Sequence, residues 1–183
     1  MWRDIFKVVT NLIFASPKTW KEIDKENYSR NLFLNQFLHP IFGIIALTSF
    51  IGGLWFSRGG NVESALKQTI ISVVTVYGGY FIATYTLNEL APRFGLKKNI
   101  SRFGKYVGYS SIVLYLLYII VPLFPDFIIL WLIALYTIYL VYNGAVYYVK
   151  VIEDKLVGFT LIAASLIVLS PAAINLLFTI TIK

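Results

Sequence analysis

Residues 76–95 read VYGGYFIATYTLNELAPRFG and join the end of a long apolar run to a basic loop. The run from Gln68 to Asn88 holds 21 residues without a charge. As a helix it would extend about 31 Å, roughly the thickness of a bilayer core. Glu89 follows this run, Pro92 stops the helix, and five cations come before the next apolar run, at Arg93, Lys97, Lys98, Arg102 and Lys105. The stretch therefore predicts a membrane span whose C-terminal end faces the cytoplasm.

The composition is that of an integral membrane protein. Of the 183 residues, 58% are hydrophobic and 14% are charged, and the mean hydropathy is +0.73. The net charge of +7 does not indicate nucleic acid, because the basic residues cluster at the ends of apolar runs, where topology and anionic lipid explain them. We therefore expect the lipid bilayer as a partner and no nucleic acid. The absence of cysteine excludes disulfides and thiolate metal sites.

The apolar runs predict an all-α fold, a polytopic membrane protein with five transmembrane helices in a bundle. The membrane domain is expected at 37–183, with spans at about 38–57, 68–88, 106–124, 127–149 and 156–180. Ser101 and Asp126 are expected to cap the third and fourth spans. Pro171 lies near the middle of the fifth span and predicts a kink there.

Residues 1–36 predict a cytoplasmic tail made of amphipathic helices that lie at the membrane interface. Its first apolar residues recur at helical spacing, at Trp2, Ile5, Phe6, Val9, Leu12 and Ile13. Ser16 and Pro17 then indicate an N-cap and a first-turn proline of a second short helix. Trp2 and Trp20 are the expected interfacial anchors. Periodicity does not separate lipid contact from packing on the protein itself, so both readings stay open.

The distribution of Lys and Arg predicts the orientation. The tail, the second loop and the fourth loop hold six, five and two cations, while the opposite side holds only three, at Arg58, Lys67 and Lys183. The N-terminus is therefore expected in the cytoplasm and the C-terminus on the far side.

Sequence motifs for catalysis are absent. There is a single histidine, His39, at a span boundary, and no Gly-Lys-Ser/Thr phosphate loop. Glu89 has Arg93 four residues on, which predicts a local ion pair rather than a proton relay. We therefore expect no enzyme, no cofactor and no metal site.

Polar and aromatic residues form stripes at helical spacing on three spans, and such faces belong against other helices. These residues define a candidate intramembrane polar seam, at Tyr77, Thr84, Asn88, Glu89, Ser111, Tyr115, Tyr136, Tyr139 and Asn143. The stripes on spans two, three and four are expected to meet in the bundle interior. The seam is either structural, through hydrogen bonds between helices, or the lining of a transport path.

Five short motifs, in this order, resemble the bacterial branch of the Yip (Ypt-interacting protein) family over nearly the whole chain. They are the Ser16-Pro17-Lys18-Thr19-Trp20 segment, Tyr77-Gly78-Gly79 with Asn88-Glu89-Leu90, Tyr109-Ser110-Ser111, the hairpin at Pro122, and Tyr142-Asn143-Gly144. Relatives often place a proline soon after Tyr-Ser-Ser, whereas Ile112 and Val113 follow here. The proline kink of that position therefore does not carry over.

The resemblance implies five spans with a cytoplasmic N-terminus, in a bacterial cytoplasmic (inner) membrane, and a periplasmic or extracellular C-terminus. Eukaryotic members are associated with Rab-type GTPases and vesicle traffic, but that role and its residues do not transfer to this chain. The expected function is a non-enzymatic membrane protein that binds or organises other membrane proteins or lipid. The alternative is a small transporter or channel with a Tyr/Asn-lined path between spans two, three and four. A homo-oligomer stays open.

Overall fold

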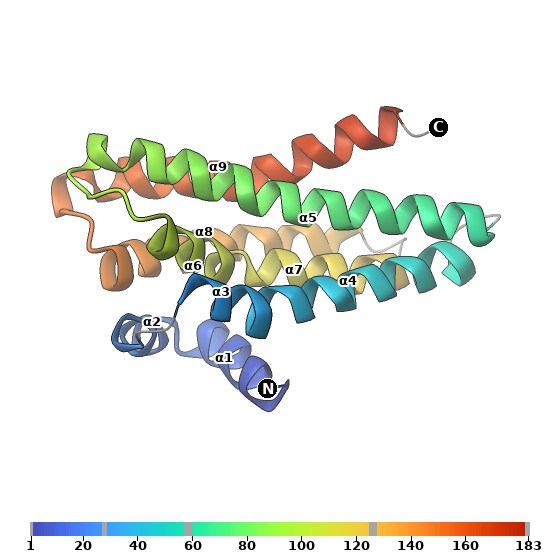
Figure 1. Cartoon of the computed structure of the whole chain (residues 1–183), viewed down its shortest axis with the longest axis horizontal. Coiled ribbons are helices and arrows are strands. Elements are labelled where there is room, and N and C mark those ends of the chain that lie inside the picture. Colours follow the sequence, from blue (N-terminus) through green and yellow to red (C-terminus); the bar gives the residue numbers. More distant parts are fainter. Residues whose placement is uncertain (1, 27–28, 57–59, 125–127, 182–183) are drawn as a thin grey trace.

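The protein is an all-α bundle in the computed structural model, which describes residues 2–26, 29–56, 60–124 and 128–181. No strand occurs within these ranges. Four helices are long and apolar enough to cross a membrane, and a fifth span is complete if one bent pair counts as a single span. They run along the long axis of the molecule (Figure 1). The prediction of an all-α, polytopic membrane bundle is confirmed.

The first two spans are longer than the apolar runs alone. Their main helices are α3 (Arg30–Phe33), α4 (His39–Ile51) and α5 (Val62–Leu90). One π-helical turn, Leu34–Leu38, joins α3 to α4 and a second, Gly52–Phe56, follows α4, so that the candidate span runs from Arg30 to Phe56. The Asn61 side chain starts α5 by accepting a hydrogen bond from the Ser64 N–H at 2.8 Å.

The third span bends by 46° between α6 (Ile100–Ser110) and α7 (Ile112–Ile120). No proline is present at this bend. Instead, the Ser111 hydroxyl donates a hydrogen bond to the Val107 carbonyl at 2.8 Å. Such a bond to the preceding turn often bends a helix. The N-cap of α6 is Asn99, which accepts from the Arg102 N–H at 3.0 Å, and not Ser101 as predicted.

The last two spans form a helical hairpin around Lys150. The fourth runs from Ile129 to Val149 and contains α8 (Tyr136–Gly144), and the fifth is α9 (Glu153–Thr181). The expected cap Asp126 lies outside the described residues. Helix α9 continues through Pro171, and its C-terminal half leans away from α5 (Figure 1).

Helices α5 and α9 approach each other closely at a glycine. A Cβ atom on Gly79 would lie 2.9 Å from the Cβ and Cδ atoms of Pro171, and one on Gly78 would lie 2.6 Å from Cδ1 of Ile174. Larger residues at these positions would force the two helices apart. The Tyr77-Gly78-Gly79 motif is therefore a packing motif at this crossing.

The tail forms two helices beside one end of the bundle, α1 (Trp2–Phe14) and α2 (Ser16–Lys25) (Figure 1). Ser16 is the first residue of α2 and its hydroxyl makes no cap hydrogen bond, so the predicted N-cap is wrong and Ala15 holds that position. On α1, Ile5 and Leu12 are buried. The tail thus packs on the protein itself along one face.

Candidate functional site

Trp20 of α2 is inserted into the bundle and is 0% exposed. Its ring lies 5.5 Å from that of Tyr148, 5.9 Å from Tyr106 and 6.0 Å from Tyr109, between centroids. Gly144 makes this possible, because a Cβ there would lie 2.8 Å from Trp20 Cζ2. The prediction that Trp20 anchors the tail in lipid is therefore wrong. The side chain of Trp2, the other predicted anchor, lies outside the described residues.

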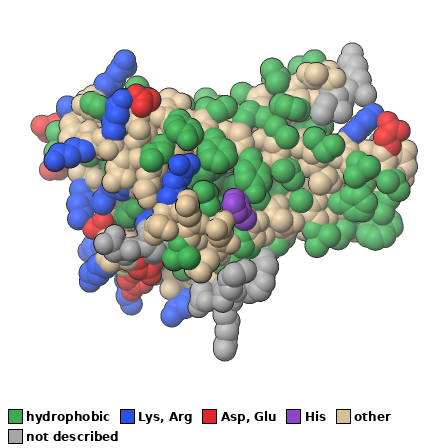
Figure 2. Space-filling view, in the orientation of Figure 1, with side chains coloured by type: hydrophobic (Ala, Val, Ile, Leu, Met, Phe, Trp, Pro, Cys, Tyr) green, Lys and Arg blue, Asp and Glu red, His purple; other side chains and the backbone are tan. Residues whose placement is uncertain are grey.

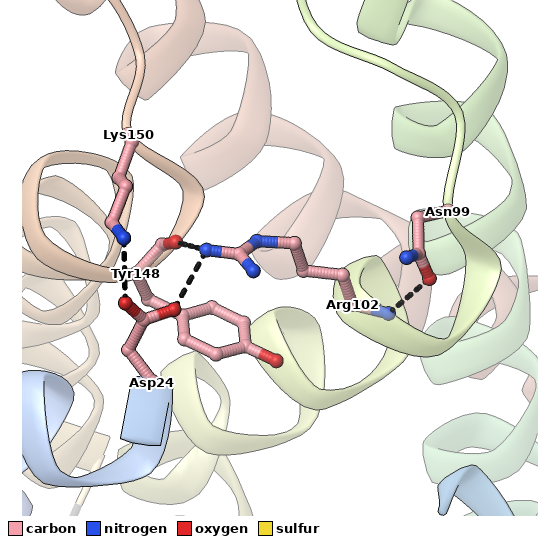
Figure 3. A network of polar contacts seen from close by, with 5 residues as sticks. All are labelled: Asp24, Asn99, Arg102, Tyr148 and Lys150. Carbon is pink, nitrogen blue, oxygen red and sulfur yellow. Dashed lines mark hydrogen bonds and ion pairs between the residues drawn. The ribbon is translucent and has the colours of Figure 1, made fainter. Parts of the chain in front are cut away.

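One helical turn after Trp20, Asp24 connects the tail to two cations of the bundle (Figure 3). Its Oδ1 accepts from the Arg102 guanidinium at 2.8 Å, and its Oδ2 lies 2.7 Å from Lys150 Nζ. The Arg102 guanidinium also donates to the Tyr148 carbonyl and lies 4.6 Å from the centre of the Tyr148 ring. The carboxylate therefore joins α2 to α6 and to the end of the fourth span.

The charge of Asp24 is maintained by these partners. Partial burial alone would raise the pKa of the carboxyl, but the hydrogen bond from Lys150 and the charge of Arg102 outweigh burial and hold this pKa below its ordinary value of 3.8. Lys150 has a left-handed backbone with φ of 64°, which is uncommon for a residue with a side chain. It ends the fourth span and presents its ammonium group to Asp24.

Two further contacts hold the tail helices. The Tyr136 hydroxyl donates to the Ile13 carbonyl at the end of α1, at 2.6 Å. Lys21 Nζ lies 4.8 Å from the centre of the Tyr147 ring. We call this assembly the tail-docking site, defined by Trp20, Asp24, Arg102, Tyr106, Tyr136, Tyr148 and Lys150.

The tail-docking site lies at the basic end of the molecule. Figure 2 shows that most of the visible Lys and Arg side chains gather at the end that holds α2 and the α5–α6 turn, while hydrophobic side chains cover much of the remaining surface. At the opposite end, Lys67 pairs with Glu63 at 2.9 Å.

The predicted seam residues of the second and third spans are mostly buried. Thr84, Asn88, Ser111 and Tyr115 are buried, and Tyr77 is half-buried. Tyr115 and Ser111 line a cavity of about 10 Å³, which is room for about one water molecule. Of the predicted seam, Ser111 and Tyr115 are thus the two residues that line this cavity.

The seam residues of the fourth span face another part of the structure. Asn143 is 4% exposed and its amide donates to the Tyr139 carbonyl of its own helix at 2.8 Å. Tyr136 bonds to the tail, as described above. Tyr139 is 43% exposed, so the expectation that it lies in the bundle interior is wrong. The predicted seam residues are therefore not brought together at one place: Ser111 and Tyr115 line the interior cavity, Tyr136 bonds to the tail, and Asn143 bonds within its own helix.

Glu89, the acidic residue of the predicted seam, lies on the surface. It pairs with Lys98 and not with Arg93 as predicted. The reason is local, because residues Ala91–Phe94 form a tighter 3₁₀ turn that removes Arg93 from the α-helical position one turn above Glu89. Gly95, with φ of 75°, then reverses the chain and brings Lys98 back.

Comparison with known proteins identifies the family. The family model described as the Yip1 domain matches residues 11–175, which is most of the chain. The chain belongs to the Yip family. A search of curated proteins found no match, and a search of solved structures found none either.

In this Yip-family chain, the matched range begins within α1 and ends within α9, so the entire tail-docking site lies inside the domain. Among the described residues, no group of three or more His, Asp or Glu side chains could hold a metal ion. The polar groups that the structure brings together are instead those of helix docking.

Sequence reasoning missed five of the seven members of this site, among them the ion pair of Asp24 and Lys150. Tyr106 is fully buried and its hydroxyl donates to the Val141 carbonyl at 2.9 Å, and Tyr148 and Arg102 bind the tail. The available signal was the proximity of tyrosines to both basic loops, at Tyr106 and Tyr109 after the second loop and at Tyr147 and Tyr148 before Lys150. Aromatic residues in a basic loop region are suited to stacking with cations and with a tryptophan.

Proposed function

We propose that this Yip-family protein is a non-enzymatic membrane protein that uses its docked tail to bind lipid and other membrane proteins. The observation that carries the proposal is the outer surface of α1, where Phe6 is 75% exposed and Phe14 is 84% exposed. Both rings are exposed while Ile5 and Leu12 of the same helix pack inward. Large exposed aromatic side chains on a helix beside a membrane bundle favour contact with acyl chains or with a partner helix.

An apolar groove next to α1 adds support. It has a volume of about 630 Å³ and is lined by Ile13 of α1, by residues of α7, and by Leu132, Ile133 and Tyr136 of the fourth span. Since Tyr136 bonds to Ile13, the docked tail forms one wall of this groove. A change in tail docking would alter the groove, which links the tail to a surface that faces the bilayer.

Site-specific photo-crosslinking tests the proposal. A benzophenone amino acid at Phe14 should crosslink to lipid acyl chains or to a discrete membrane protein in intact membranes. The same probe at Glu22, an exposed polar position of α2, is the matched control and should give neither product. Equal crosslinking at both positions, or none at Phe14, would contradict a specific apolar contact.

The transporter alternative has less support, because the interior cavity is lined by Ser111 and Tyr115 but by no described residue of the fourth span, and Tyr139 is exposed. A proteoliposome assay distinguishes the two functions. A solute flux that is lost in Asn143→Leu, with normal amounts of folded protein, would favour the transporter.

The orientation is part of the proposal: a bacterial inner-membrane protein with its N-terminus in the cytoplasm and its C-terminus outside. The excess of Lys and Arg at the end that holds the tail supports it. Single cysteines at Gly60 and Lys183 should react with an impermeant reagent on intact cells, and one at Asn99 should react only after lysis. Reaction of Asn99→Cys on intact cells would invert the topology.

A further inference from the structure

A second polar cluster lies on the other side of α6, where three helices meet. A Cβ atom on Gly104 of α6 would lie 2.8 Å from the Tyr80 hydroxyl of α5, 3.7 Å from Arg30 Nε of α3 and 3.7 Å from Thr84 Cγ2. Because residue 104 has no side chain, a guanidinium and two hydroxyl groups can converge at this point. None of the three belongs to the tail-docking site.

Three polar atoms of this cluster are buried without a hydrogen bond of good geometry. Tyr80 is 3% exposed and Thr84 is 0% exposed. The Tyr80 Oη, Thr84 Oγ1 and Arg30 Nε atoms are all shielded from solvent and make no hydrogen bond of acceptable geometry, although the Tyr80 hydroxyl lies near both other groups. Buried polar groups in native proteins almost always have a partner. A ligand from outside the chain that brings hydrogen-bond acceptors would complete this cluster.

The charge of the cluster indicates the chemistry of that partner. Arg30 takes part in none of the ion pairs between described residues. Its guanidinium carbon lies over the Phe81 and Tyr85 rings, at 6.0 Å and 5.9 Å from their centres. Stacking on rings occupies the face of a guanidinium and leaves its N–H groups available in the plane. One positive charge and two hydroxyl donors suit an oxyanion, and arginine binds phosphate especially well.

The position of the cluster along the membrane identifies the source of the phosphate. Helix α5 has 29 residues, so it is about 43 Å long and, when centred in a bilayer core of about 30 Å, exceeds it by about 7 Å at each end. Thr84 lies six residues before the end of α5, or about 9 Å along the axis, near the boundary between acyl chains and headgroups. Tyr85 beside it is 52% exposed. A headgroup in the bilayer could therefore reach Arg30 from the side.

We propose that Arg30, Tyr80 and Thr84 bind the phosphate of a phospholipid in the leaflet at the basic end of the protein. Gly104 allows the hydroxyl of Tyr80 to approach α6, and the Phe81 and Tyr85 rings hold the guanidinium beside the acyl region. This site does not depend on the partner-binding function of the tail.

Native mass spectrometry and thermal unfolding of the purified full chain test the site. Dioleoyl-phosphatidylglycerol supplies a lipid phosphate, dioleoylglycerol supplies the same acyl chains without it, and inorganic phosphate supplies the anion alone. We expect phosphatidylglycerol to bind at least about tenfold more tightly than dioleoylglycerol and to raise the unfolding temperature, since charge-assisted hydrogen bonds have this strength. Inorganic phosphate at equal concentration should do neither.

The variants locate the site. Arg30→Gln should reduce phosphatidylglycerol binding about tenfold, to the level of dioleoylglycerol. Arg93→Gln makes the same change at an exposed arginine of the same end and should leave binding unchanged. Thr84→Val keeps the volume and removes only a hydroxyl, so it tests the site even if Arg30→Gln does not fold. Equal binding of both lipids, or equal loss in Arg93→Gln, would overturn the proposal. Full competition by inorganic phosphate would overturn the lipid assignment.

Discussion

Truncation of Trp20 should release the tail from the bundle. In Trp20→Ala the indole that lies between Tyr106, Tyr109 and Tyr148 is lost, and the cavity would be lined by rigid rings and by Gly144. A buried tryptophan removes about 150–250 Å² from solvent, which at about 25 cal/mol per Å² corresponds to about 4–6 kcal/mol. Measured truncations of buried tryptophan or phenylalanine cost about 3–5 kcal/mol. We therefore expect tail docking to weaken by about 3–5 kcal/mol.

Hydrogen exchange of the backbone amides of α2 measures the weakening of tail docking directly. A loss of about 3 kcal/mol corresponds to an increase of about a hundredfold in exchange rate, if α2 opens locally. Exchange in the middle of α5 should change little, because that helix packs mainly on α4 and α9. The matched control is Trp55→Ala, which removes the same side chain where it is 70% exposed.

The difference in burial between Trp20 and Trp55 decides what the two variants should show. In Trp55→Ala the α2 amides should exchange at the wild-type rate. If α2 exchanges at the wild-type rate in Trp20→Ala as well, then Trp20 does not hold the tail and the docking argument is wrong. Faster exchange over the whole bundle would also contradict it, because the tail would then be part of the global core.

Three more perturbations have defined outcomes. Because the pKa of Asp24 is lowered on docking, the stabilisation of the docked tail by Asp24 is fully present above pH 3.8, the ordinary pKa, and is lost as pH falls through the lower docked value. Asp24→Asn should weaken docking at neutral pH by about 2 kcal/mol and so raise the exchange rate of the α2 amides. An unchanged rate would contradict the ion network. Asn143→Leu should lower the free energy of unfolding by only about 1 kcal/mol, because the Asn143 amide bonds to its own helix. A loss above about 4 kcal/mol would indicate that Asn143 has another partner. Gly79→Ala should destabilise the bundle by about 1–3 kcal/mol through its clash with Pro171, whereas Gly43→Ala, with no atom within 4 Å, should not.

The spans could be predicted from sequence because their signals are local. An uncharged run such as Gln68 to Asn88 has no stable place other than a bilayer or a large core. The end of α5 was also predictable, since Pro92 and Gly95 allow no regular helix to continue. The N-caps were less accurate. Asn99 and Ser101 are both suitable capping residues, and only the path of the chain decides between them.

The bend at Ser111 was missed because a serine hydroxyl can bond to the preceding turn or to another helix. The resemblance associated a kink at this position with proline, and the sequence has none. In the structure the hydroxyl bonds to the Val107 carbonyl and the helix bends without proline. Composition does not encode which of these bonds forms, because it depends on the packing of α6 and α7 around it.

The position of Trp20 was not predictable for a related reason. Helical spacing shows that Trp20 and Ile23 share a face, but not whether that face meets lipid or protein. The deciding feature is the cavity formed by Gly144 and the tyrosines, which are distant in sequence. The seam residues illustrate the same limit, since Tyr139 and Asn143 share a stripe and yet only Asn143 is buried.

Both polar sites depend on α6, and this gives the short helix a central position. Arg102 and Tyr106 bind the tail and the fourth span, while Gly104 and Gly108 allow close packing of Tyr80 and Phe33 from the first two spans. Helix α6 ends at the bend at Ser111, so its axis differs in direction from that of α7, the second part of the same span. A shift of α6 would therefore change the tail-docking site and the Arg30 cluster together.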